Sequence, residues 1–261
     1  MGKENVQGFI ISSHYETGEQ TIINLFGRLA DGRSFRVMVP RQPYFFIRES
    51  DVQKAKELMS INVQQVGLQT MHEETVVQVV LDNPKEVPVL RKLFEDNDIS
   101  CFEADIRFTQ RYLLDNDILS AIDIQGEASK GEYTDLEFFD PVITPIEGKN
   151  RARPTMLSID IETDEKANKI YSISLYDKDH AEVIVINNES MDDMTLEHAT
   201  LVADEKDLLT TFMTRVREID PDIIVGWNVI DFDFKVIAKN CKLHNLHLAL
   251  GRSDDAVHFR F

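Results

Sequence analysis

The sequence predicts an α/β protein built from two parts, and three observations support this fold class. Residues 44–106 show strand and helix patterns in the order β-α-β-β-α-β, after a first series of strands. Glycine and proline then punctuate an acidic stretch over residues 120–155. From residue 155 onward, three strands, a helix, a strand and a helix follow one another. A chain of 261 residues can form two domains that each have a core.

The N-terminal part begins with three predicted strands, at residues 6–17, 20–30 and 33–39. Thr17-Gly18-Glu19 and Asp31-Gly32 supply the turns between them. Because Asp-Gly between two apolar runs is a strong hairpin signal, we expect tight connections here.

The β-α-β-β-α-β unit follows these strands. Its four strands are expected at residues 44–47, 63–70, 75–81 and 100–106. The first helix is expected over residues 49–60, and Pro88 suggests that the regular part of the second begins only there. This order is that of the ferredoxin-like split βαβ arrangement. RNA-recognition domains share this fold, but their aromatic strand motif is missing, so we favour a scaffold over an RNA-binding domain.

The C-terminal part has a different pattern. Strands are expected at residues 156–162, 170–176, 181–186 and 222–227, and helices at residues 204–219 and from about residue 234. This order fits the opening of a ribonuclease-H-like α/β fold. We place the domain boundary late in the punctuated stretch, so that the domains span residues 1–145 and 146–261.

Composition excludes several classes of protein. The net charge of −18 argues against a simple basic nucleic-acid binder, because phosphate affinity comes mainly from Lys and Arg. The two cysteines, Cys101 and Cys241, match no metal-binding spacing and suggest no disulfide framework. The absence of a long apolar run or a secretory signal argues against a membrane partner. We therefore expect a reducing, cytoplasmic location.

Two acidic residues stand on one face of the predicted strand at residues 156–162. Asp160 and Glu162 point the same way, because strand side chains alternate with a period of two. Held together, two carboxylates repel each other unless a cation lies between them. Two Mg²⁺ ions about 3.5–4 Å apart can activate a water and stabilise a leaving oxygen. The alternative is a half-buried strand with a solvated polar face.

A second group of polar residues follows the apolar segment 222–227. Asn228 comes first, and Asp233 lies in the opening turn of the next predicted helix, where the helix dipole favours a carboxylate. The alternative is a plain capping role, with Asp231 as the N-cap residue. An isolated Asn or Asp at such a place is more often a cap than a ligand.

These two segments resemble exonuclease motifs of family B DNA polymerases. Asp160-Ile161-Glu162-Thr163 resembles the first motif, Asp-x-Glu, and Asn228-x-x-x-Phe232-Asp233 resembles the second. Asp-x-Glu alone is weak evidence for the family. The order of the two motifs, their spacing and the helix predicted between them match the family as well.

Other segments extend the resemblance over most of the chain. Residues 103–107 and 111–113 are similar to a stretch late in the family's N-terminal domain. Residues 220–228 and 250–252 are similar to the bacterial DNA polymerase II group within the family. The N-terminal strands are the least specific.

The resemblance implies a DNA-directed DNA polymerase with a 3′→5′ proofreading exonuclease, in DNA replication and repair. It implies that the catalytic and metal-binding residues are Asp160, Glu162 and Asp233, with two Mg²⁺ or Mn²⁺ ions in the complete site. Its implied substrate-binding residues are Thr163, Asn228 and Phe232. The implied partners are a single-stranded 3′ end and primer-template DNA, with a possible sliding clamp.

The third exonuclease motif of the family, Tyr-x-x-x-Asp, does not occur in this sequence. We therefore expect an incomplete exonuclease domain and a chain with little activity of its own. Two other hypotheses remain open: a free-standing nuclease of the same fold, and a non-catalytic nucleic-acid-binding scaffold. A nuclease should bind Mn²⁺ at Asp160 and Glu162, whereas a pure scaffold should not.

Overall fold

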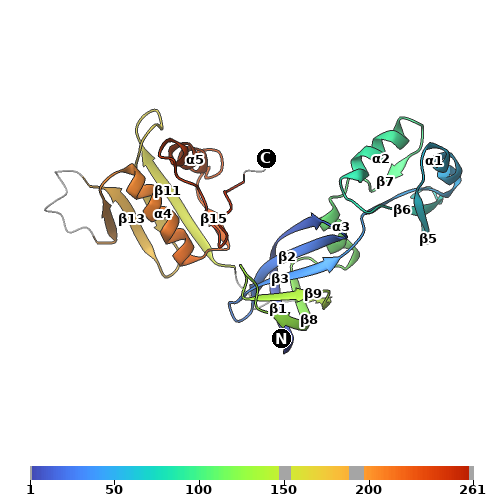
Figure 1. Cartoon of the computed structure of the whole chain (residues 1–261), viewed down its shortest axis with the longest axis horizontal. Coiled ribbons are helices and arrows are strands. Elements are labelled where there is room, and N and C mark those ends of the chain that lie inside the picture. The colour runs from blue at the N-terminus through green and yellow to red at the C-terminus, as the bar shows by residue number, and fades with distance from the viewer. Residues whose placement is uncertain (1, 147–153, 188–196, 259–261) are drawn as a thin grey trace. The chain divides into compact units, whose positions relative to one another are not determined.

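The computed structural model describes residues 2–146, 154–187 and 197–258. The chain divides into two compact units, Met1–Arg153 and Pro154–Phe261 (Figure 1). The described residues form two apolar clusters in the first unit and one in the second. No helix in the described part of the chain has the length and apolar character needed to cross a membrane.

The first unit contains a six-stranded sheet in which five of the strands pair in a closed ring. Its strands are β1 (Gly2–Thr17), β2 (Thr21–Leu29), β3 (Ser34–Pro40), β8 (Ala121–Ser129), β9 (Leu136–Phe139) and β10 (Val142–Pro145). Their order is β1-β2-β3-β9-β8-β10, and β1 also pairs with β8. The three predicted N-terminal strands are confirmed. Much of the punctuated stretch belongs to this sheet, because its Gly and Pro residues separate short strands.

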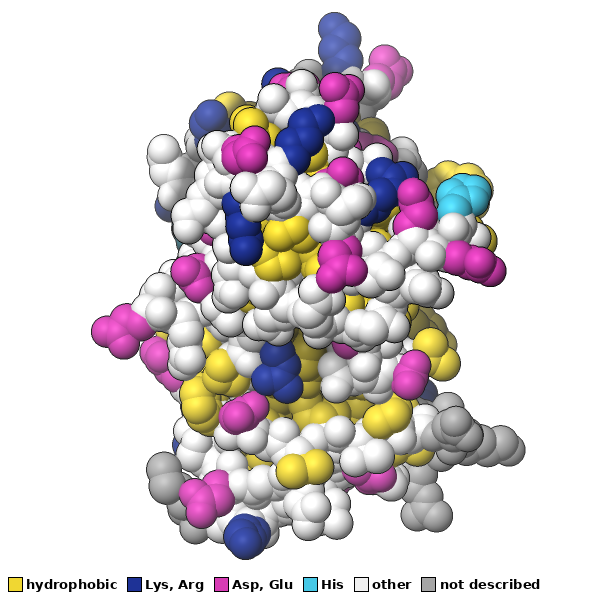
Figure 2. Space-filling view, turned by 90° about the vertical axis from the view of Figure 1, so that its right-hand side faces the viewer, with side chains coloured by type: hydrophobic (Ala, Val, Ile, Leu, Met, Phe, Trp, Pro, Cys, Tyr) yellow, Lys and Arg dark blue, Asp and Glu magenta, His cyan; other side chains and the backbone are white. Residues whose placement is uncertain are grey.

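The same unit contains a second, four-stranded sheet. Its elements are β4 (Tyr44–Arg48), a short 3₁₀ turn (Glu49–Asp51), α1 (Val52–Leu58), β5 (Asn62–Gln69), β6 (Thr75–Val80), α2 (Glu86–Glu95) and β7 (Cys101–Phe102). The strand order is β5-β6-β4-β7, and every neighbouring pair is antiparallel. Figure 2 looks at the end of the unit with α1 and α2, where acidic and basic side chains are interspersed.

Three elements of this region differ from the predictions. Helix α2 begins at Glu86, two residues before the expected start at Pro88. The helix tolerates Pro88 because this residue lies in the first turn, where backbone N–H groups have no partner within the helix. Strand β7 is only two residues long, and Glu103 after it has a left-handed backbone (φ 59°). Helix α3 (Phe108–Asp115) was not predicted.

Within residues 154–187 and 197–258, the second unit is a five-stranded sheet with two helices. Its elements are β11 (Met156–Thr163), β12 (Ile170–Tyr176), β13 (Ala181–Ile186), β14 (Ala199–Val202), α4 (Glu205–Ile219), β15 (Ile223–Val225) and α5 (Asp233–Leu243). The strand order is β14-β13-β12-β11-β15. Strand β12 is antiparallel to both neighbours, whereas β15 is parallel to β11 and β14 is parallel to β13. Strand β14 was not predicted, and β15 is shorter than expected.

Helix α4 lies across one face of this sheet (Figure 1). The Asp204 carboxylate caps its start by accepting a hydrogen bond from the Asp207 N–H at 2.9 Å. At its end, Asp220 adopts a left-handed backbone with φ 51°. Leu208, Phe212 and Val216 form the face of α4 that is buried against the sheet. Helix α5 joins the same apolar cluster, so both helices cover the face opposite Asp160 and Glu162.

Candidate active site

Strand β11 separates an apolar face from an acidic one, as predicted. Leu157, Ile159 and Ile161 are buried, whereas Asp160 and Glu162 are exposed. The residues opposite the two carboxylates on β12 are Ser174 and Ser172, whose side chains are short. The two carboxylates therefore stand on an open face of the sheet.

Asp233 is the buried acidic residue of the site. It is the first residue of α5, and only 2% of it is exposed. Burial raises the pKa of its carboxyl group, and the charge of Asp160 raises that pKa further. Hydrogen bonds from the backbone of Asp233 itself and of Ile161 act in the opposite direction, but the net pKa is raised. The carboxyl groups of Asp160 and Asp233 are thus close enough to interact electrostatically.

Asp231 is not the N-cap of α5. The N-cap position is Phe232, and no side chain caps it. The Asp231 carboxylate instead accepts a hydrogen bond from the Lys235 ammonium at 2.7 Å. The capping alternative for Asp231 is therefore wrong.

The loop between β15 and α5 spans the edge of β11 beside Asp160. Strand β15 pairs with β11 only as far as Val225. At the next residue, Gly226, a Cβ atom would lie 2.6 Å from the carbonyl oxygen of Ile159, so the close approach needs a glycine. The loop ends at Asp233, which the Ile161 backbone contacts. Its two ends thus contact β11 on either side of Asp160.

The three predicted substrate-binding residues lie along this strand end and loop. Thr163 ends β11, and its hydroxyl donates to the Asp164 carbonyl oxygen at 3.0 Å. Asn228 is exposed and adopts a left-handed backbone with φ 55°. The Phe232 N–H donates to the Asn228 carbonyl oxygen at 2.9 Å, and the Phe232 side chain is exposed.

The carboxylates of this site are suitable ligands for a divalent cation, but too few of the described ones are grouped together. Carboxylate oxygens are the ligands that Mg²⁺ and Mn²⁺ prefer. Within residues 2–146, 154–187 and 197–258, however, no three His, Cys, Asp or Glu side chains are grouped so that they could hold a metal ion. What the described residues do bring together is one pair of carboxyl groups, those of Asp160 and Asp233, with Glu162 further along the same face of β11.

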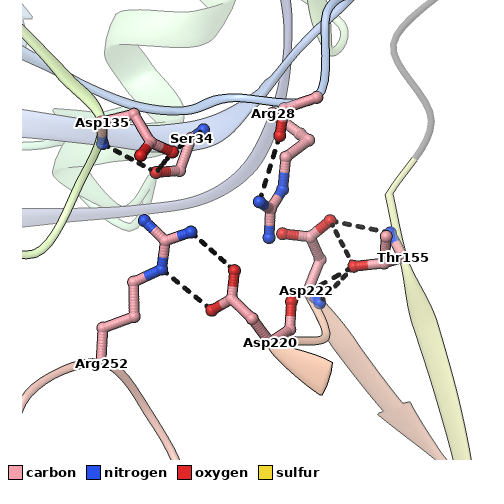
Figure 3. Close-up of polar contacts among 8 residues, drawn as sticks. Arg28, Ser34, Asp135, Thr155, Asp220, Asp222 and Arg252 are labelled. Atoms are coloured by element: carbon pink, nitrogen blue, oxygen red, sulfur yellow. Dashed lines mark hydrogen bonds and ion pairs between the residues drawn. The ribbon is translucent and has the colours of Figure 1, made fainter. Parts of the chain in front are cut away.

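Sequence reasoning missed the contacts that hold the surrounding elements in place. Glu205 accepts a hydrogen bond from the Ile170 N–H at 2.7 Å, and its other oxygen lies 3.0 Å from His244 Nε2. Within the second unit, the Arg252 guanidinium makes two hydrogen bonds to the Asp220 carboxylate, at 2.9 and 2.6 Å (Figure 3). These contacts join the start of α4 to the start of β12 and to the end of α5, and they join the end of α4 to Arg252.

A buried carboxylate elsewhere in the unit has a structural role. Glu182 on β13 accepts hydrogen bonds from Arg215 Nε at 2.7 Å and from the Thr200 hydroxyl at 2.5 Å, and lies 3.0 Å from His180 Nε2. Burial acts to raise the pKa of Glu182, but the hydrogen bonds from Arg215, Thr200 and His180 outweigh it, so the pKa is lowered. Glu182 is therefore an ionised member of an internal polar network.

Comparison with known proteins decides the family. The family model described as DNA polymerase family B, exonuclease domain, matches residues 99–260. The chain belongs to this family. The segment of this family B chain that matches the model begins within the first unit. It therefore includes α3 and strands β8 to β10 as well as the second unit. The family predicted from the two motifs is thereby confirmed.

Individual relatives agree with this family B assignment. DNA polymerase II of Escherichia coli is 24% identical over 97% of this chain and 32% of its own length. A DNA polymerase of Archaeoglobus fulgidus is 28% identical over 98% of this chain and 33% of its own length. The solved family B DNA polymerase of Pyrobaculum calidifontis has the same fold, with a TM-score of 0.74 and 20% identity over 96% of this chain and 34% of that chain. The chain thus spans about a third of the length of these relatives.

Proposed function

We propose that the chain is the N-terminal part of a DNA-directed DNA polymerase, and that its second unit begins a 3′→5′ proofreading exonuclease. The observation that carries this proposal is that the buried Asp233, at the start of α5, accepts a hydrogen bond from the backbone of Ile161, the residue that follows Asp160 on β11, and that the charge of Asp160 raises the pKa of Asp233. A shared site of carboxylates at the edge of a sheet is suited to metal-assisted hydrolysis of a phosphodiester.

The order of the strands supports the finer fold assignment. The antiparallel order β5-β6-β4-β7 is what a ferredoxin-like βαββαβ unit requires. The order β14-β13-β12-β11-β15, with β12 antiparallel, supports a ribonuclease-H-like start to the exonuclease domain. We propose a division of the domains after residue 145, close to the point at residues 153 and 154 where the two compact units divide.

In the proposed reaction, Asp160, Glu162 and Asp233 would hold divalent cations, either Mg²⁺ or Mn²⁺. Such ions, when bound, supply activation of a water and electrostatic stabilisation of the leaving oxygen. A nearby cation would favour the ionised form of Asp233, which burial and Asp160 otherwise disfavour.

The substrate is the unpaired 3′ end of a DNA primer. In this proposal Thr163, Asn228 and Phe232 orient it, which their position beside the strand and helix that carry the carboxylates supports. Primer-template DNA, a sliding clamp and a cytoplasmic location remain expectations for the full-length enzyme.

The RNA-binding alternative has less support. The aromatic ring of Phe102 has the Arg48 guanidinium 5.3 Å from its centroid, but Arg48 Nε lies 2.8 Å from a carboxylate oxygen of Glu74. Arg111 is likewise paired with Glu103. Because these guanidinium groups already have carboxylate partners, they are poorly placed to neutralise phosphates.

We expect the 261-residue chain itself to degrade labelled single-stranded DNA slowly or not at all, with either Mg²⁺ or Mn²⁺. A metal site that lacks a ligand positions its ions poorly, and the net charge of −18 weakens association with DNA. The assay is release of mononucleotides, run beside the full-length enzyme.

Two outcomes of this assay are informative. Digestion by the full-length enzyme, lost in its Asp160→Ala variant, supports the proposed exonuclease. Comparable turnover by the 261-residue chain, also lost on Asp160→Ala, would show that another residue of the chain completes the site, as in a free-standing nuclease.

A further inference from the structure

Trp227 is the single tryptophan of the chain, and 92% of it is exposed. Tryptophan is highly buried on average in folded proteins, so such exposure is informative. In the same loop, Ile230 is 54% exposed and Phe232 is 41% exposed. The loop therefore presents three large apolar side chains to solvent.

The backbone places Trp227 at the edge of the carboxylate site. It directly follows Gly226, whose Cα approaches the carbonyl oxygen of Ile159, one residue before Asp160. The other end of the loop returns to Ile161, one residue after Asp160. Trp227 thus begins the segment that spans the edge of β11 beside Asp160.

Hydrogen bonds and packing order this loop. The Phe232 N–H donates to the Asn228 carbonyl oxygen at 2.9 Å, and the Phe234 N–H donates to the Val229 carbonyl oxygen at 2.8 Å. Val229 packs against the apolar core of the unit. The exposure of Trp227 is therefore a property of an ordered loop with an anchored centre.

The charges of the chain indicate what such a ring can bind. A net charge of −18, with Asp160 and Glu162 exposed nearby, gives phosphate groups few cations to pair with. An unpaired nucleobase instead offers an uncharged π-face, and stacking on an aromatic ring tolerates every base.

We propose that Trp227 stacks on an unpaired base of single-stranded DNA and so holds the strand beside Asp160 and Asp233. The inference rests on the proposed exonuclease function. It adds a stacking residue to Asn228 and Phe232, and it makes base stacking a main source of affinity.

A fluorescence titration tests the inference directly, because the signal comes from Trp227 alone. The 261-residue chain is titrated with a short oligothymidylate in EDTA, so that no strand is cleaved. We expect saturable quenching of the tryptophan emission, with a shallow dependence on salt because few phosphates are neutralised. An abasic oligonucleotide of equal length keeps the phosphates but lacks the bases, and it should leave the emission unchanged.

Variants measure the contribution of the ring to affinity. In anisotropy measurements with a labelled oligothymidylate, Trp227→Ala should weaken binding by about 5- to 100-fold. Trp227→Phe should restore most of the affinity, because a ring remains. Leu243→Ala, which removes another exposed apolar side chain of the same unit, should leave binding unchanged.

Absence of quenching, or equal affinity of the wild type and Trp227→Ala, would overturn the inference. This failure is distinguishable from failure of the proposed function, because the titration needs no metal or hydrolysis. A full-length enzyme with Asp160-dependent exonuclease activity but an unresponsive Trp227 refutes the stacking role alone. Base-dependent quenching combined with hydrolysis that is insensitive to Asp160→Ala refutes the proposed catalytic site and leaves Trp227 a base-binding residue.

Discussion

Changing Asp160 and Glu162 together to alanine is expected to abolish removal of a mismatched 3′ nucleotide by the full-length enzyme, while primer extension survives. Both carboxylates stand on the open face of β11, and Asp160 interacts with Asp233. Removing a single well-placed electrostatic group commonly costs about 100- to 1,000-fold in rate, so we expect a loss of at least about 100-fold. Excision of a labelled mismatched primer end measures it.

A control for this experiment lies on the same strand. Ser158 shares the face of Asp160 and Glu162 but carries no charge, so Ser158→Ala should excise at close to the wild-type rate. Excision at the wild-type rate by the double variant would refute the assignment of these carboxylates. Loss of primer extension in parallel with excision would indicate instead that the substitutions disturb the whole enzyme.

The second large effect is expected on stability. Arg215→Ala removes the guanidinium that pairs with Glu182, which is only 8% exposed, and so leaves a buried carboxylate without its main partner. Breaking a fully buried pair costs about 3–5 kcal/mol. Because the Arg215 side chain is 31% exposed, we expect a loss of about 2–3 kcal/mol in the free energy of unfolding.

Hydrogen exchange of the amides in α4 and β13 reports this loss for the second unit specifically. Arg217→Ala is the matched control on the same helix, because Arg217 pairs with Asp254, which is 96% exposed. That change should cost less than about 1 kcal/mol. Equal effects of the two substitutions would show that the Glu182 network contributes little to stability.

The same network gives the second unit a pH dependence. The pKa of Glu182 is lowered in the folded state from its ordinary value of 4.5. Its contribution to stability is therefore complete above pH 4.5 and is lost as the pH falls through the lowered value. The stability difference between the wild type and Arg215→Ala should therefore shrink as the pH falls below 4.5, and a difference that does not change as the protein is acidified would contradict this explanation.

Local patterns were sufficient to predict the elements that carry the candidate site. The alternation along residues 157–162 identified the strand and the shared face of Asp160 and Glu162. The change to helical spacing after residue 232 placed Asp233 at the start of a helix. Side-chain direction in a strand and position in a helix depend on the nearest residues, so a sequence reveals both.

Partners that lie far apart in the sequence could not be predicted in this way. The Ile170 N–H and the Glu205 carboxylate are 35 residues apart, and Glu182 and Arg215 are 33 residues apart. Strand β14 is four residues long and pairs in parallel with β13 alone, so it lacks a distinct local pattern. Strand β15 ends at Val225, because the chain at the next residue, Gly226, passes close to the backbone of Ile159. That contact joins two segments far apart in the sequence, so local patterns do not reveal it.

The most direct test of the proposed site is the position of Mn²⁺ in crystals of the 261-residue chain soaked at millimolar concentration. Anomalous scattering locates the ion without reference to activity. The structure predicts a peak within coordination distance of carboxylate oxygens of both Asp160 and Asp233, and the loss of this peak in crystals of Asp160→Asn. Mn²⁺ bound only elsewhere, or a peak that persists unchanged in Asp160→Asn, would contradict the assignment of these two residues to one metal site.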